Sequence, residues 1–197
     1  MIDAASSSRE LIAEHARILF EDHGFAGVSV RQIAAAAGVD PSLVIRHYGS
    51  KEGLFLTVIG LDWYVSPALE GPIETLGRRL AGWVLAPEHV DFRVRLSTLI
   101  RASDREAVRE GLRLTVRRMF VDRLVEVMPG EDRLARAELI VAQLGGVVQA
   151  SAGESGLLES VSGQRLVDLF GQAIQALVEP ASLELADPMP TERADDE

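Results

Sequence analysis

Hydrophobic residues recur along this chain three and four positions apart, which is the spacing of amphipathic helices rather than of strands. The first such segment covers residues 8–23. Its apolar face consists of Ile12, Ala16, Leu19 and Phe20. Ser8 has the chemistry of an N-cap, and Gly24 follows the last periodic residue, where glycine commonly ends a helix. The pattern therefore predicts one helix over 8–23 that buries a single face.

Three shorter helices are predicted next, over 30–37, 41–48 and 51–65. Each follows a residue whose side chain can accept a hydrogen bond from the free N–H groups of a helix start. These capping residues are Ser29, Asp40 and Ser50. Gly38 ends the first of the three helices and is expected to adopt a positive φ, which glycine accepts most easily. Pro41 suits the first turn of the second helix, and Pro67 is expected to stop the third.

The remainder of the chain continues the helical pattern. Helices are expected over about 72–86, 88–102, 104–128, 131–152 and 162–178, with breaks at Pro87 and at Pro129-Gly130. No alternating pattern of useful length and no internal repeat appears. The sequence therefore predicts an all-α fold.

Composition and charge narrow the class of protein. The formal net charge is −10, yet residues 1–55 carry five basic and seven acidic side chains, so much of the acidic excess lies elsewhere. The chain has no cysteine, which removes disulfide frameworks and cysteine zinc sites. The N-terminus lacks the basic start and apolar core of a signal peptide. The longest apolar stretch is too short to span a bilayer. We therefore expect a cytoplasmic protein with no membrane partner.

The stretch from Val28 to Phe55 is the most informative part of the chain. Two short helices joined by a tight turn at Gly38 can hold the second helix rigidly, and the major groove of DNA, about 12 Å wide, admits one helix. The side chains of helix 41–48 expected to face outward are Ser42, Ile45 and Arg46. Arg46 suits guanine O6 and N7 or a phosphate, Ile45 suits a thymine methyl group, and Ser42 can reach either strand. This pattern predicts a DNA-binding helix.

Residues on both sides of that helix are candidates for phosphate contacts. Ser29 and Arg31 lie at a helix start, where free N–H groups and the helix dipole favour an anion. His47, Tyr48 and Lys51 cluster where helix 41–48 ends and the next begins. Several of these residues also have an ordinary structural interpretation, Ser29 as a cap, Tyr48 as packing and His47 as a surface residue. Phosphate contacts would fix the position on DNA without carrying sequence information.

These same residues carry a resemblance to a known family. Within residues 9–55, the segments LFEDHGFAGVSV and RQIAAAAGVDPSLVIRHYGSKEGLF resemble the N-terminal DNA-binding domain of TetR-family bacterial transcriptional regulators. The chain departs from the family pattern at Ile45, where the family often has tyrosine, and at Tyr48, where it often has phenylalanine. The resemblance implies a homodimeric regulator, usually a repressor. Such a regulator leaves its double-stranded DNA operator when a small-molecule effector binds the C-terminal domain, and no cofactor is implied.

The resemblance divides the chain into a helix-turn-helix DNA-binding domain over 1–55, a helical ligand-binding and dimerisation domain over 56–180, and a tail. That tail, 181–197, is acidic and contains proline, and is expected to be disordered. The last two long helices carry apolar stripes that form either internal core or a four-helix interface between two subunits. A two-fold dimer can address half-sites roughly 34–36 Å apart, which favours the interface. The interface candidates are Val141, Leu144, Gly145, Val148, Leu169, Phe170 and Ala173.

Aromatic and methionine side chains of the middle helices either fill the core or line a ligand pocket. The pocket candidates are Trp63, Trp83, Phe92, Met119 and Phe120. A metal site at His89 is not expected, because no cysteine or second histidine lies near it. The chain lacks the Glu-x-x-His pairs of a di-iron bundle and any defensible nucleophile–base motif, so no enzymatic activity is expected. Two alternatives stay open, a helix-turn-helix protein that binds DNA without an effector and a helical enzyme or carrier.

Overall fold

The computed structural model of this chain describes residues 4–60, 66–152, 158 and 160–180. Every regular element within those ranges is helical, which confirms the predicted all-α fold. The predicted disordered tail, 181–197, lies outside the described residues.

The N-terminal unit consists of α1 (Ala4–His23), α2 (Val30–Ala36), α3 (Pro41–Tyr48) and α4 (Lys51–Ile59). The three predicted caps before α2, α3 and α4 each accept a hydrogen bond from a backbone N–H in the first turn. Gly38 has the predicted positive φ, at 65°, and Gly24, which ends α1, also has a positive φ, at 67°. Ser8 lies inside α1 rather than at its start, because the helix begins at Ala4, within a segment that carries no periodic apolar signal in the sequence.

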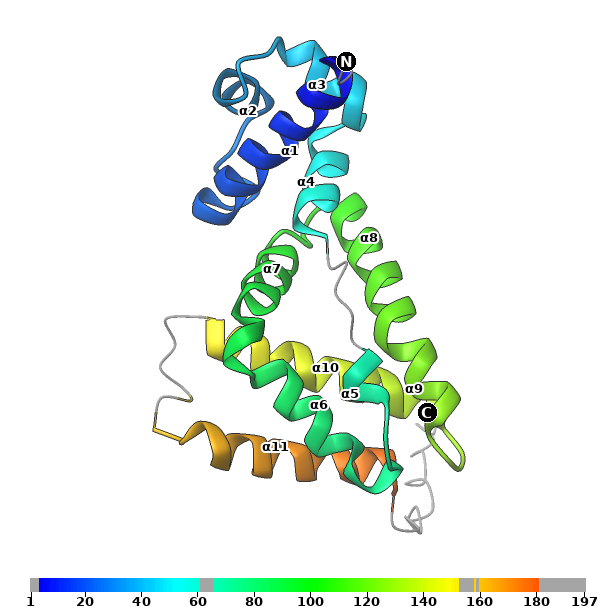
Figure 1. The fold of residues 1–197 in the computed structure, drawn as a ribbon. Helices are drawn as coiled ribbons and strands as arrows, with labels where there is room; N and C mark the ends of the chain where they lie inside the picture. The colour runs from blue at the N-terminus through cyan, green and yellow to red at the C-terminus, as the bar shows by residue number, and fades with distance from the viewer. Residues whose placement is uncertain (1–3, 61–65, 153–157, 159, 181–197) are drawn as a thin grey trace, which may run out of the picture.

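The described part of the C-terminal unit contains five helices of ten residues or more and several shorter segments. They are α5 (Ser66–Leu69), η1 (Ile73–Thr75), α6 (Leu76–Leu85), η2 (Pro87–His89), α7 (Val90–Arg101), α8 (Glu106–Val116), η3 (Arg117–Val121), α9 (Asp122–Val127), α10 (Arg133–Ala152) and α11 (Gly163–Val178). Figure 1 shows α7, α8–α9 and α10 as three sides of a triangle, with α6 and α11 along its base. The N-terminal unit lies at the opposite end and joins the triangle through α4.

Two helix ends differ from the sequence prediction. Helix α4 stops at Ile59 rather than near Val65, because Gly60 leaves the helical region with φ −47° and ψ 150°. The helix predicted over 104–128 begins at Glu106 and contains a π turn, η3, between α8 and α9. A π turn adds a residue to one helical turn and changes the direction of the side chains that follow. Phe120 and Val121, inside this turn, are both buried.

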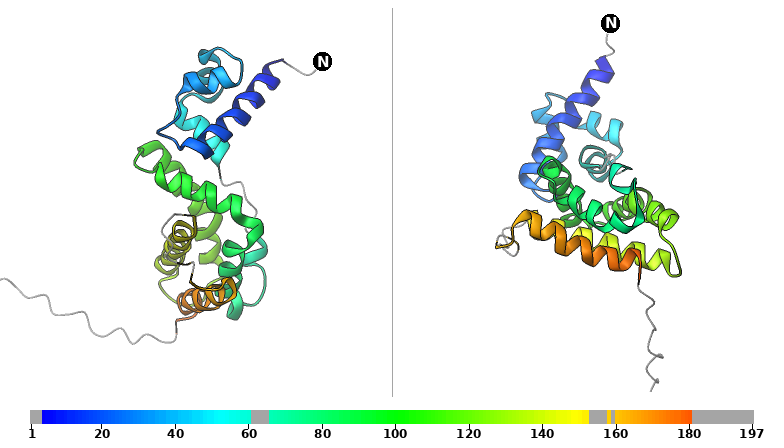
Figure 2. Two further views of the ribbon diagram at one scale, coloured as in Figure 1. Left: turned by 90° about the vertical axis from the view of Figure 1, so that its left-hand side faces the viewer. Right: turned by 60° about the horizontal axis from the view of Figure 1, so that its bottom comes forward.

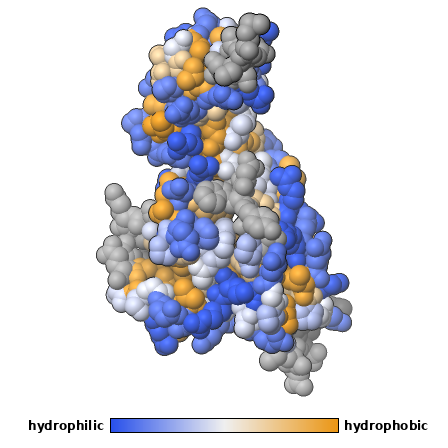
Figure 3. Space-filling view, in the orientation of Figure 1, coloured by the Kyte–Doolittle hydropathy of each residue, from blue (hydrophilic) through white to orange (hydrophobic). Residues whose placement is uncertain are grey.

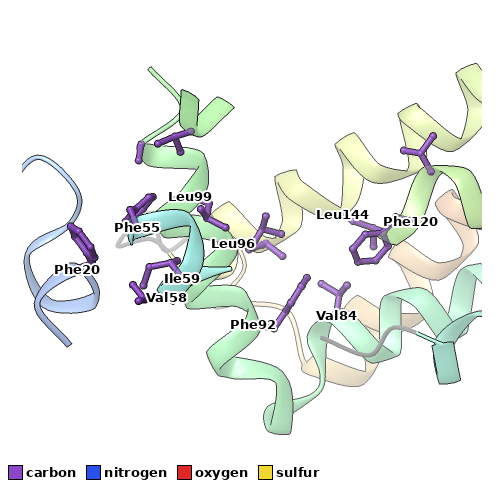
Figure 4. Packing of buried hydrophobic residues seen from close by; sticks show 14 of the residues in the cluster. Phe20, Phe55, Val58, Ile59, Val84, Phe92, Leu96, Leu99, Phe120 and Leu144 are labelled. Carbon is purple, nitrogen blue, oxygen red and sulfur yellow. The ribbon is translucent and has the colours of Figure 1, made fainter. Parts of the chain in front are cut away.

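A cluster of aromatic rings joins the N-terminal helices to α4. The ring centroids of Phe20 and Phe25 each lie 5.0 Å from that of Phe55, in edge-on arrangements. Figure 4 shows Phe55 and Ile59 of α4 beside Leu99 of α7. These residues belong to one hydrophobic core that continues from the N-terminal unit into the C-terminal unit. Helix α4 therefore packs against the other helices of the N-terminal unit and also against the C-terminal unit.

Helices α6 and α11 approach each other so closely that glycine is required on both. A Cβ atom on Gly77 would lie 2.4 Å from the carbonyl oxygen of Gly171, and one on Gly171 would lie 2.8 Å from the Cα of Arg78. The Gln175 side chain crosses between the helices. Its Oε1 accepts a hydrogen bond from the N–H of Gly77 at 2.8 Å, and its Nε2 donates to the carbonyl of Ile73 at 2.9 Å. Gln175 thus satisfies backbone groups at a helix start that lacks its own cap.

A buried arginine fixes the end of α11 to the start of α10. Arg136 is only 7% exposed. Its Nη1 donates to the carbonyls of Leu177 and Val178, both at 3.0 Å, and its Nε donates to the carbonyl of Glu131 at 2.9 Å. An arginine at the C-terminal end of a helix is favourable because the last carbonyls carry partial negative charge.

Candidate nucleic-acid interface and internal cavity

Helix α3 presents one side to solvent and buries the other. Ser42, Ile45 and Arg46 are exposed, with Ile45 45% accessible, whereas Val44 is fully buried. The outward edge of α3 is therefore the one that its periodicity predicts. This edge is free within the subunit to enter a groove.

Two arginines of the N-terminal unit are available to bind an anion. Arg31 on α2 and Arg46 on α3 are exposed. Neither guanidinium makes an ion pair or a hydrogen bond with any residue that the structure describes. Because arginine offers several donors in a planar fork, each can bind a phosphate or a guanine edge.

The N-cap of α3 determines what Ser42 can offer to a base. Asp40 Oδ1 accepts hydrogen bonds from the hydroxyl of Ser42 at 2.5 Å and from its N–H at 2.8 Å. These two bonds hold the pKa of Asp40 below its ordinary value, and the bond from the Ser42 hydroxyl has the larger effect. Since the hydroxyl proton points to Asp40, Ser42 presents lone pairs outward. It can accept a hydrogen bond from the amino group of adenine or cytosine.

Ser29 belongs to a capping box that the sequence analysis did not identify. Its Oγ accepts a hydrogen bond from the N–H of Gln32 at 3.3 Å, and Gln32 Oε1 accepts one from the N–H of Ser29 at 2.8 Å. The Ser-x-x-Gln spacing was the available signal. The polar groups of Ser29 therefore serve the start of α2, and Arg31 is the stronger candidate for a phosphate there.

Tyr48 connects the end of α3 to the start of α1. Its hydroxyl donates a hydrogen bond to the backbone carbonyl of Arg9 at 2.7 Å. The guanidinium carbon of Arg9 lies 5.5 Å from the centre of the Tyr48 ring. These contacts favour the packing interpretation of Tyr48 over a phosphate contact.

Replacing Tyr48 by phenylalanine is expected to lower the free energy of unfolding by about 1 kcal/mol, because one hydrogen bond is lost while the ring remains. Chemical unfolding followed by circular dichroism measures this change. The variant should bind duplex DNA with the salt dependence of the parent protein. A smaller salt dependence would instead assign the hydroxyl to a phosphate.

Lys51 and His47 lie beside this contact. The Nζ of Lys51 lies 4.0 Å from the centre of the Phe25 ring, and burial there lowers the pKa of Lys51. The ring of His47 is half-buried, with its centroid 6.4 Å from that of Tyr48. Both side chains keep some exposure, so both remain candidates for phosphate contacts.

An apolar cavity of about 370 Å³ lies inside the C-terminal unit. Its walls come from α6, α7, α8, η3 and α10. The described lining residues are Val84, Phe92, Leu96, Ile100, Leu112, Val116, Phe120, Val141, Ala142, Leu144, Gly145, Gly146, Val148 and Gln149. Figure 4 shows Val84, Phe92, Phe120 and Leu144 grouped around this space.

Two of the five predicted pocket residues line the cavity. Phe92 and Phe120 line the cavity. Trp83 is not among the lining residues but contacts Phe92, with ring centroids 4.8 Å apart. Met119 is half-buried outside the lining, because the π turn directs its neighbour Phe120 inward instead. Trp63 lies outside the described residues.

The interface candidates on α10 border the cavity, and Val141 and Gly145 among them keep partial exposure. All four line the cavity: Val141, Leu144, Gly145 and Val148. The exposed apolar positions of α10 are Leu134 and Leu139, which are 45% and 53% accessible, together with Ala135, Ala142 and Gly146. Ala142 and Gly146 also line the cavity. Helix α10 is apolar on almost every side, so periodicity alone does not select the outward face.

The interface candidates on α11 do face outward. Leu169 is 46% accessible, Ala173 is exposed and Phe170 is half-buried. The left view of Figure 2 shows α10 and α11 side by side along one flank of the C-terminal unit. Five exposed residues of these two helices, Leu139, Ala142, Gly146, Leu169 and Ala173, are here called the apolar face.

The described residues meet neither the requirements of a three-ligand metal site nor those of a membrane-spanning helix. Around α8 the visible surface is mainly hydrophilic (Figure 3), as expected from exposed Arg109, Glu110 and Arg113. The Nδ1 of His89 lies 2.7 Å from the carbonyl oxygen of Trp83, and no cluster of three metal-ligating side chains occurs in the described ranges. Within those ranges, no helix has the length and hydrophobicity needed to cross a membrane.

Two family models match the chain. The model for bacterial regulatory proteins of the tetR family matches residues 12–58. The model for a tetracyclin repressor-like C-terminal domain matches residues 74–178, which is more than half of the chain. The two matches cover the N-terminal and the C-terminal units described above.

Curated relatives match a shorter segment. The transcriptional repressor AcnR of Corynebacterium glutamicum is 39% identical over 60 residues, covering 30% of this chain and 32% of that protein. The transcriptional regulatory protein RaaS of Mycobacterium tuberculosis is 55% identical over 49 residues, covering 22% of this chain and 23% of that protein. The chain therefore spans about a third or less of the length of these relatives.

Solved structures match almost the whole chain. A TetR-family regulator from Streptomyces coelicolor superposes with a TM-score of 0.56 at 30% identity, over 88% of this chain and 95% of that chain. NalD, the secondary repressor of the MexAB-OprM multidrug efflux pump in Pseudomonas aeruginosa, superposes with a TM-score of 0.65 at 20% identity. That match covers 85% of this chain and 96% of that chain, and it shows a shared fold.

Proposed function

The chain belongs to the TetR family of bacterial transcriptional regulators, and from this premise we propose that it is a repressor that binds its operator as a homodimer and is released by a small molecule. The observation that carries the proposal is that one helix, α4, contacts both the DNA-facing helix and the helices around the cavity. The free outward edge of α3 and the walls of the cavity are both attached to α4.

In this proposal α3 enters the major groove. Arg46 contacts a guanine or a phosphate, Ile45 contacts a thymine methyl group and Ser42 accepts a hydrogen bond from a base. Arg31, His47 and Lys51 contact the DNA backbone on either side. Because the net charge is −10, these few local cations supply the attraction that a broad basic face provides in other DNA-binding proteins.

Replacing Arg46 by alanine is expected to weaken binding to the operator by about 1–3 kcal/mol and to relax the preference at one base pair. Electrophoretic mobility shifts on the operator and on singly substituted operators measure both effects. Arg118→Ala, which removes the same charge from exposed η3, is the control and should leave binding unchanged. An unchanged base preference in the Arg46 variant would remove this residue from the base-contacting set.

A second copy of the chain is proposed to cover the apolar face of α10 and α11. One helix-turn-helix makes few base contacts, whereas a two-fold dimer places two recognition helices in successive major grooves. Four helices, two from each subunit, would then bury Leu139 and Leu169, which are each about half exposed in one subunit.

We propose that a ligand in the cavity changes the affinity for DNA by moving α4. Leu112 lines the cavity from α8, and its neighbour Gly111 packs against Leu56 of α4. A Cβ atom at Gly111 would lie 2.7 Å from Leu56 Cδ1, so the two helices are in close contact. On the other wall, Leu96 lines the cavity from α7, which also packs against α4. A ligand that moves either wall therefore changes the position of α4 and of the helices it carries.

The proposed function is tested directly with the DNA that flanks the gene for this chain. Purified protein should retard a fragment of that DNA, and footprinting should show two protected half-sites related by two-fold symmetry. The spacing of their centres should be about one helical turn or a small multiple of it. Equal binding to any duplex of the same length would contradict a sequence-specific regulator.

A further inference from the structure

We propose that the cavity takes an uncharged, largely apolar small molecule that carries one hydrogen-bond donor, and that Gln149 accepts its hydrogen bond. This inference rests on the proposed function only where it identifies that molecule with the effector. The binding chemistry itself rests on the cavity walls.

The walls exclude a charged ligand. Among the described lining residues, Gln149 supplies the one side chain with hydrogen-bonding atoms, and none is ionisable. A carboxylate or an ammonium group placed among such residues would lose its hydration with no opposite charge to replace it. The same walls favour an apolar body, because burial of apolar surface is the main source of affinity that they offer.

One polar atom is left for the ligand to satisfy. The Oε1 atom of Gln149 is buried and has no hydrogen-bond partner within the described structure. A buried polar group without a partner is unfavourable, and most such groups in folded proteins are paired. A hydroxyl or N–H group on a bound molecule would pair with this oxygen once rotation of the Gln149 side chain turns it toward the cavity. The position of Gln149 on α10 therefore predicts a single donor on the ligand rather than several.

The size of the cavity limits the ligand. A volume of about 370 Å³ holds about a dozen groups the size of a water molecule, at roughly 30 Å³ each. The rings of Phe92 and Phe120 face this space with centroids 6.4 Å apart and planes inclined by 49°. Inclined rings at this distance suit edge-to-face contact with an aromatic ring. A compact phenol-like molecule of about ten to fifteen non-hydrogen atoms satisfies both conditions.

The neighbouring hollow does not supply a site for an anionic head group. It shares Val116 and Val141 with the cavity and contains Arg113, Arg117 and Glu138. Both arginines are already paired on α8–α9. Arg113 bonds to Glu110 at 2.7 and 2.8 Å, and Arg117 bonds to Asp122 at 3.3 Å. An anionic amphiphile would have to compete with these carboxylates, so the uncharged class is favoured.

The test is isothermal titration calorimetry of the full chain with three probes of one shape, 1-naphthol, naphthalene and 1-naphthoate. We expect 1-naphthol to bind about two- to tenfold more tightly than naphthalene, which is the range for one hydrogen bond, and 1-naphthoate to bind at least tenfold more weakly than 1-naphthol. Gln149→Leu should abolish the preference for 1-naphthol while naphthalene still binds. Gln149→Met, of similar length, is the second variant in case leucine does not fold.

The control is Gln164→Leu, which makes the same change at an exposed position of α11 outside the cavity. It should keep the preference of the parent protein. Tighter binding of 1-naphthoate, a preference for 1-naphthol that survives loss of Gln149, or no binding of any probe would each overturn the inference. Operator release is measured separately by mobility shift. Binding of 1-naphthol through Gln149 without release would support the assigned ligand class and contradict its role as effector.

Discussion

Replacing Gly77 by alanine is expected to lower the free energy of unfolding by about 3 kcal/mol, although alanine is normally the better helix residue by about 1 kcal/mol. The added Cβ would lie 2.4 Å from the carbonyl oxygen of Gly171 and 2.5 Å from the backbone nitrogen of Gln175. Both are backbone atoms, so no side-chain rotation relieves the overlap and α11 has to move. The hydrogen bond from Gly77 to Gln175 lies in the same contact and is lost with it.

Gly82→Ala is the matched control, because it makes the same substitution on the same helix. A Cβ atom at Gly82 would meet only Val167 Cγ1, at 3.9 Å, which is ordinary van der Waals contact. This variant is expected to be unchanged or more stable by up to about 1 kcal/mol. Urea unfolding of the parent and both variants measures the difference. Equal stability of the two variants would show that the α6–α11 contact does not require glycine at position 77.

The N-terminal unit could be predicted closely from sequence because its signals are local. A cap residue acts within the first turn of its own helix, and a positive φ depends on the glycine itself. Asp40, Gly38 and Gly49 therefore locate α3 without knowledge of any distant residue. The outward direction of Arg46 follows from the same short pattern, since Val44 must point the opposite way.

The C-terminal unit depends on contacts that no local pattern reveals. Gly77 and Gly171 are far apart in the chain, and only their meeting in space explains why both lack a side chain. The π turn at η3 shifts the helical register, so the periodicity expected for a regular helix did not separate Met119 from Phe120. In the sequence, Arg136 is indistinguishable from a surface arginine. Its structural role depends on its hydrogen bonds to the end of α11, which is distant in the chain.

The functional sites follow the same division. The candidates on α3 are exposed as predicted, because one face of a short amphipathic helix must be solvated. On α10 the choice between a cavity-lining face and an outward face was not available from sequence, since apolar residues occupy both. Nothing in the sequence singles out Gln149, because the same helix carries a second glutamine, Gln143, and neither belongs to a recognisable motif. Its significance comes from the cavity beside it and from an oxygen without a partner.

Replacing Ala173 by glutamate is expected to convert the proposed dimer to a monomer and to weaken operator binding about 100-fold or more. Ala173 is exposed in the single subunit, so the carboxylate is solvated there and the fold is retained. In a two-fold interface each contact occurs twice. Both carboxylates would then be buried among apolar residues such as Leu169 without a partner of opposite charge. An uncompensated buried charge is unfavourable by about 3–5 kcal/mol, which corresponds to a loss of affinity of this size.

Ala107→Glu, at an exposed position of α8, makes the same change away from the apolar face and serves as the control. Analytical ultracentrifugation should find dimers for the parent and for this control and monomers for Ala173→Glu, while circular dichroism finds the same helix content in all three. Because α3 is far from α11 in the structure (Figure 1), reduced operator binding in a folded monomer would arise from the loss of the second recognition helix. A dimer that tolerates glutamate at position 173 would place the subunit contact on another surface.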